Sequence, residues 1–126
     1  MSALFSTDFD DWLVQTYARI GSFTIFVILV DIGERSVTLL RSTHLHVVGD
    51  EIRWPDMVGL LDGSGVAWHG AAFFQADRDG LVTDADAKLR LASLVRHLNE
   101  DRTILNDGEF FDRHGLRLKL KEIVPK

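Results

Sequence analysis

Two histidines separated by a single residue, His44 and His46, are the first candidates for chemistry in this sequence. They lie in a stretch rich in β-branched and apolar residues, which predicts a strand, and side chains two positions apart on a strand share a face. Two imidazoles on one face can chelate zinc or another transition metal. His69 and Asp31 are the candidates for a third ligand, and a solvated strand face is the alternative interpretation.

A second candidate metal site is the acidic segment 75–86, QADRDGLVTDAD, which partly follows the twelve-position calcium loop of EF-hands. Its candidate carboxylate ligands are Asp77, Asp79 and Asp86. Gly80 falls at the sharp turn of that loop, but Gln75 replaces the first aspartate, and the last ligand is one methylene shorter than the usual glutamate. We therefore expect a structural turn without calcium, followed by a helix that Thr83 caps.

The C-terminal segment EFFDRHGLRLKLKEI predicts a hairpin with leucines on the inner face and basic side chains on the outer face. The basic residues are Arg117, Lys119 and Lys121. They could contact an acidic partner, or they could form a solvated face that discourages edge-to-edge aggregation.

No catalytic or cofactor-binding motif is present in the sequence. The absence of cysteine excludes a thiol nucleophile, a zinc–thiolate site and a disulfide. Ser64 lies between two glycines but lacks the GxSxG pattern, and no GK[ST] follows them. A restriction-type nuclease site would need Asp86 and Lys88 on a strand, whereas they begin a predicted helix. We therefore assign no catalytic residue and predict no cofactor.

The charge balance makes nucleic acid an unfavourable partner. Nineteen acidic residues against 14 basic ones give a net charge of −5, and neutralising phosphates requires the opposite sign. The longest apolar run, residues 23–30, is far shorter than the roughly 20 residues that span a bilayer. The first residues also lack the pattern of a secretory signal. These features predict a cytoplasmic protein without a membrane partner.

The elements that must position these residues form a single α+β domain over residues 1–126. Apolar residues at three- and four-residue spacing predict helices over 7–20 and 84–100, each with a threonine cap. The continuous apolar stretch 23–32 predicts a central strand buried on both faces. Further strands are expected at 36–48, 52–54 and 66–75 and in the C-terminal hairpin, which predicts a mainly antiparallel sheet of about five strands with the two helices packed on it. In the second strand one face is expected to carry Val37, Leu39, Leu45 and Val47.

The absence of catalytic motifs favours a non-enzymatic protein-binding or regulatory domain, for example an immunity- or antitoxin-like factor that meets its partner through complementary charge. One alternative is a metal-dependent hydrolase or nuclease that uses His44, His46, His69 and Asp31. Another is a calcium-binding protein with a degenerate loop at 75–86. Twelve aromatic residues are many to bury in 126, so we also expect a two-fold homodimer.

Overall fold

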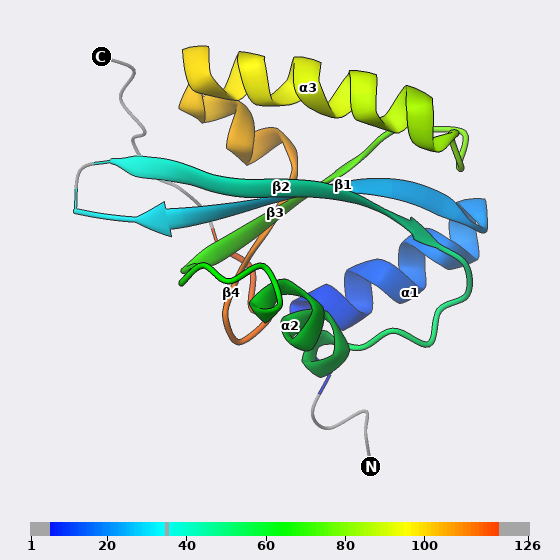
Figure 1. The fold of residues 1–126 in the computed structure, drawn as a ribbon. Coiled ribbons are helices and arrows are strands. Elements are labelled where there is room, and N and C mark those ends of the chain that lie inside the picture. Colours follow the sequence, from blue (N-terminus) through cyan, green and yellow to red (C-terminus); the bar gives the residue numbers. More distant parts are fainter. Residues whose placement is uncertain (1–5, 35, 119–126) are drawn as a thin grey trace.

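Helices cover both faces of one antiparallel sheet in the computed structural model, which describes residues 6–34 and 36–118 (Figure 1). The described strands are β1 (Phe23–Ile32), β2 (Val37–Val47), β3 (Gly70–Gln75) and β4 (Glu109–Asp112), in the order β2-β1-β3-β4. The helices are α1 (Asp8–Ile20), α2 (Trp54–Asp62), α3 (Asp84–Glu100) and the 3-10 helix η2 (Arg102–Asp107). The predicted small α+β domain with an antiparallel sheet is confirmed. No helix in the described ranges is long and apolar enough to cross a membrane.

Strand β1 is the centre of the sheet and is buried on both faces, as its apolar sequence predicts. Its odd-numbered residues, such as Phe23 and Val27, pack in the core beneath α1 and α2. Its even-numbered residues, such as Ile28 and Val30, pack in the core beneath α3 and η2. One strand therefore joins two hydrophobic cores.

The core on the α1 side is aromatic. Phe9 lies between the rings of Trp54, Phe73 and Phe111, with ring centroids 5.0, 5.2 and 5.6 Å away. Helix α1 begins with the predicted capping box, in which Thr7 and Asp10 each accept a backbone N–H of the other. The second carboxylate oxygen of Asp10 accepts the Trp54 N–H at 2.7 Å. This hydrogen bond ties the start of α2 to the start of α1.

The described sheet has four strands, whereas the sequence predicted about five. The predicted short strand at 52–54 is wrong, because the chain leaves the sheet after β2 and begins α2 at Trp54. Burial of the Trp54 indole among the rings of the α1-side core, together with the Asp10 hydrogen bond, favours the helix start over a strand. The predicted strand at 66–75 is also shorter, since β3 begins at Gly70.

A β-bulge corrects the predicted face of the second strand. The register between β1 and β2 shifts between the pairs Ile28–Ser42 and Val30–Leu39, because two steps along β1 face three steps along β2. The extra residue moves the side chains that follow it to the opposite face of the sheet. As a result, Leu39 packs on the α3 side, whereas Leu45 packs on the α1 side.

We expect Gly80→Ala to destabilise the fold by about 1–3 kcal/mol. Gly80 has a φ of +126°, and an added Cβ would lie 2.9 Å from the Ser22 carbonyl oxygen. Gly59 in α2 is the matched control, because a Cβ there meets nothing within 4 Å. Gly59→Ala should stabilise the protein by about 0.5–1 kcal/mol in urea unfolding. Equal effects of the two substitutions would contradict this account of the turn.

The carboxylate of Asp62 should make stability pH-dependent. It accepts hydrogen bonds from Arg113 Nη1 and Trp68 Nε1, each at 3.0 Å, and the Arg113 bond is the main cause that lowers the pKa of Asp62. A carboxyl group whose pKa is lower in the folded state than in the unfolded state stabilises the fold at pH values above its unfolded-state pKa. This stabilisation is lost as the pH falls through the folded-state pKa, here below about pH 4.

Thermal melts between about pH 7 and pH 3 should therefore show a smaller acid-induced decrease of Tm for Asp62→Asn than for the parent protein. Asp50→Asn is the control, because the Asp50 side chain makes no hydrogen bond among the described residues. An unchanged pH profile for Asp62→Asn would contradict the assignment.

Candidate metal centre

His44 and His46 lie on the same face of β2, as the sequence predicted. They pair with Phe26 and Thr24 of β1, so both imidazoles project from the sheet on the side that α3 covers. Their ring centroids are 5.5 Å apart. The His44 side chain is 16% exposed and that of His46 is 34% exposed, so solvent reaches the pair without surrounding it.

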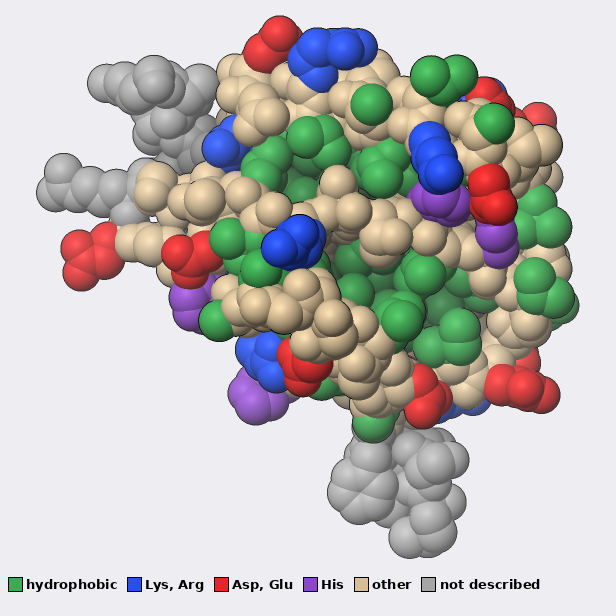
Figure 2. Space-filling model, viewed as in Figure 1, with side chains coloured by type: hydrophobic (Ala, Val, Ile, Leu, Met, Phe, Trp, Pro, Cys, Tyr) green, Lys and Arg blue, Asp and Glu red, His purple; other side chains and the backbone are tan. Residues whose placement is uncertain are grey.

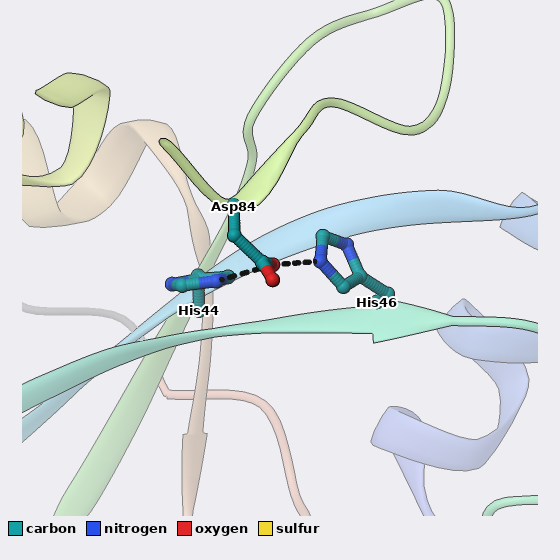
Figure 3. Close-up of side chains that lie close together, drawn as sticks. All are labelled: His44, His46 and Asp84. Carbon is teal, nitrogen blue, oxygen red and sulfur yellow. Dashed lines mark hydrogen bonds and ion pairs between the residues drawn. The ribbon is translucent and has the colours of Figure 1, made fainter. Parts of the chain in front are cut away.

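The third member of the cluster is Asp84, from the first turn of α3 (Figure 3). One of its oxygens, Oδ1, lies 3.1 Å from Nε2 of His44 and 2.5 Å from Nε2 of His46. The three ligand atoms all lie within 4.8 Å of one another, and this is the only such group of three among the described residues. Thr83 caps α3 by accepting the Asp86 N–H, which orients the first turn and leaves the Asp84 side chain free to reach the sheet.

Thr24 holds this cluster from beneath and is itself fully buried. Its hydroxyl oxygen accepts the Val82 N–H at 3.1 Å and lies 2.8 Å from Nδ1 of His46. Its backbone groups bond to the 77–82 turn and to the residue before it, with the Thr24 N–H donating to the Gly80 carbonyl and the Thr24 carbonyl accepting the Ala76 N–H. One buried threonine therefore fixes both a histidine ring and the loop that leads into α3.

The two histidines favour the ionised form of the Asp84 carboxylate. Hydrogen bonds from His46 and then from His44 lower the pKa of Asp84, although partial burial opposes them. An ionised carboxylate only accepts hydrogen bonds, so in the absence of a metal ion each Nε2 donates a proton to Asp84. A divalent cation could replace those two protons at the same place.

The donor set fits zinc or a neighbouring transition metal. Two imidazole nitrogens and one carboxylate oxygen are ligands that Zn²⁺ takes in tetrahedral sites at about 2.0–2.2 Å, which separates ligand atoms by about 3.3 Å. The observed 2.5 and 3.1 Å separations would have to widen by less than about 1 Å. The Asp84 side chain is 71% exposed and is free to make that movement.

With Nε2 bound to an ion, the neutral imidazole of His46 carries its proton on Nδ1 and donates it to Thr24. The threonine oxygen has two lone pairs, so it can accept this proton while still accepting the Val82 N–H. Thr24 is thus in the position of the outer-shell acceptor that metal-binding histidines usually have.

The other two sequence candidates for the third ligand lie elsewhere. His69 Nδ1 is 2.5 Å from a carboxylate oxygen of Asp31, at the far end of β1. Asp31 pairs with Thr38, five residues along β1 from the Phe26–His44 pair, a distance of about 16 Å along a strand. The structure therefore forms two separate groups from the four residues predicted together.

In the segment 75–86 the structure has a turn that packs on the start of β1. Gln75 ends β3, the Asp77 carboxylate accepts the Asp79 N–H at 3.3 Å, and Gly80 makes the predicted turn. Asp86 lies in α3 and pairs with Arg90. These aspartates do not converge on one point among the described residues. The segment instead contributes Asp84 to the histidine pair.

The predicted basic stripe is only partly within the described residues. Arg117 pairs with Glu109, and its guanidinium lies 5.5 Å from the ring centroid of Phe111. Lys119 and Lys121 lie outside the described residues. Arg117 is therefore engaged within the fold, and the partner surface predicted from these three residues stays a prediction.

No family model, curated protein or solved structure matches this chain. The functional argument therefore depends on the geometry of the site.

We expect Thr24→Val to destabilise the protein by about 1–3 kcal/mol, because the Val82 N–H loses its acceptor while the shape of the side chain is retained. Thr38→Val on the exposed part of β2 is the control and should change stability by less than about 0.5 kcal/mol. Urea unfolding measures both. Equal stabilities of the two variants would show that the Thr24 hydroxyl is not needed.

Proposed function

We propose that this protein is a small non-enzymatic regulatory domain that binds one divalent transition-metal ion, Zn²⁺ in the first place, through His44, His46 and Asp84. The observation that carries the proposal is the convergence of three ligand atoms within 4.8 Å from two elements far apart in the chain. A solvated strand face explains two neighbouring histidines, but it does not explain why both meet the same oxygen of a distant aspartate.

An ion at this place would join β2 to the first turn of α3. Helix α3 is attached to the sheet by a narrow apolar face, with Ala87 and Leu98 as its buried residues. A ligand that binds only the folded state stabilises it, by about 2.7 kcal/mol at a free concentration 100 times the Kd. Metal supply would therefore control how firmly the end of α3 is held on β2, which is the property of a regulatory site.

A catalytic role has less support from the surroundings of the cluster. A zinc hydrolase keeps an open coordination position, which the exposed side of Asp84 would allow. It also needs a hollow beside the ion to hold the substrate. Three hollows in the described part of the chain are each lined by other residues, and none of these three includes His44, His46 or Asp84 in its lining. We therefore favour binding over hydrolysis.

The test is a Zn²⁺ titration of the tag-free protein against a chromophoric chelator. We expect one ion per chain, and a loss of affinity of at least about 100-fold in His46→Ala and in Asp84→Ala, because removal of outer-shell groups alone costs about 10–100-fold. Substitution with Co²⁺ should give the absorption bands of a four-coordinate site in the parent only.

His69→Ala is the matched control, since His69 is an exposed histidine with its own carboxylate partner outside the cluster. It should leave the affinity unchanged. Millimolar Ca²⁺ should not compete, because calcium prefers a shell of oxygen ligands. Failure of Zn²⁺ to bind below millimolar concentration, or equal losses in His46→Ala and His69→Ala, would refute the proposal.

A further inference from the structure

The outer edge of β2 is long and lacks a strand partner among the described strands. β2 has eleven residues, and the only acidic or basic side chain that it carries apart from histidines is Arg41. Natural sheets usually keep such edges short, charged or covered, because unpaired backbone groups accept another strand. At the first residue, Arg102 Nε donates to the Val37 carbonyl at 2.8 Å and covers that end. The stretch 38–45 remains open to a partner.

Two hollows flank this open stretch, one on each face of the sheet. The α2-side hollow has a volume of about 300 Å³, and its apolar lining is Val27, Leu29, Leu45, Leu60 and Leu61. The α3-side hollow has a volume of about 200 Å³, and its apolar lining is Ile28, Leu39, Leu40 and Val95. Arg41 and Ser42 line both hollows. Hydrophobic side chains show in recesses above and below the front of the sheet in Figure 2, beneath α3 and towards α2.

We propose that the β2 edge is a docking site for an extended segment of another protein, which adds to the sheet as a fifth strand. Side chains of an added strand point alternately to the two faces. They would therefore enter the α2-side hollow and the α3-side hollow in turn, while backbone hydrogen bonds to β2 supply affinity. Eight residues at about 3.3 Å each would cover the stretch 38–45.

The chemistry of the hollows specifies this segment. The α2-side hollow is the larger and the more apolar, so it fits branched aliphatic side chains at alternate positions. The smaller α3-side hollow includes Ser42 and the Arg41 side chain in its lining, and it fits small polar residues such as threonine. The bound segment thus carries branched aliphatic side chains on one side and small polar side chains on the other.

Charge determines the central residue of the segment. Arg41 has no hydrogen bond or ion pair within the described residues, and it lies between the two hollows. An acidic side chain opposite Arg41 would pair with it as the strand docks. A second copy of β2 fits less well, because residues 37–47 contain no Asp or Glu. Two-fold pairing centred on the hollows would also bring two Arg41 side chains together.

The probe is a fluorescein-labelled synthetic peptide with alternating valine and threonine, a central glutamate and Gly-Ser ends. We expect saturable binding below about 1 mM, measured by fluorescence anisotropy, with backbone amide shifts in NMR spectra confined to β2 and the two hollows. A peptide with lysine in place of the central glutamate should bind about tenfold more weakly. N-methylation of alternate amides should abolish binding, because it removes the strand hydrogen bonds.

Two pairs of measurements make the test specific. Arg41→Glu should reverse the preference, so that the lysine peptide binds better than the glutamate peptide. Leu60→Lys should weaken binding, because Leu60 lines the α2-side hollow and is 54% exposed. Leu89→Lys should not, because Leu89 is 73% exposed on α3 and lines neither hollow.

Each of several results would overturn the proposal: no binding of either peptide, equal binding of both, or amide shifts away from β2. Self-association through β2 that excludes the peptide, seen by sedimentation, would assign this edge to a second copy and would equally refute a foreign strand. Zn²⁺ is absent from the experiment, so its outcome does not depend on the metal site.

Discussion

The arrangement of this protein depends on the burial of β1 on both faces. A strand with eight consecutive buried residues cannot lie on the surface of a two-layer fold, so helices must cover the sheet on each side. The aromatic core with α1 and α2 occupies one face, and a mainly aliphatic core with α3 and η2 occupies the other. Every other element is positioned relative to this strand, including β2, which pairs with it along most of its length.

Thr24 is the polar exception among the buried residues of that strand, and the candidate metal centre is built on it. Its side chain faces the α3 layer at the start of β1, where the sheet meets the turn that leads into α3. A buried hydroxyl must find partners, and here the partners are the turn and the imidazole of His46. The hydrogen bonds that satisfy the Thr24 hydroxyl therefore also orient the His46 ring and fix the turn that brings Asp84 within reach of that ring.

Strand β2 presents two different surfaces. Its histidines face the α3 layer near one end, whereas the bulge around Leu40 and Arg41 interrupts the regular alternation near the middle. Because the side chains before and after the bulge turn to opposite faces, the strand leaves hollows on both sides of its edge. The proposed metal site and the proposed strand-docking site thus share one element but use different atoms, imidazoles in one case and the outer backbone edge in the other.

The sequence by itself determined the elements whose signal is local. The continuous apolar stretch of β1, the capping residues Thr7 and Thr83, and the helical periodicity of α3 identified those elements, because burial and capping follow from neighbouring residues. It also placed His44 and His46 on one face. Only the tertiary structure decided the third ligand, since Asp84 comes 38 residues after His46 and its reach depends on how α3 docks. The bulge in β2 was likewise decided by packing against β1, a contact that no local pattern contains.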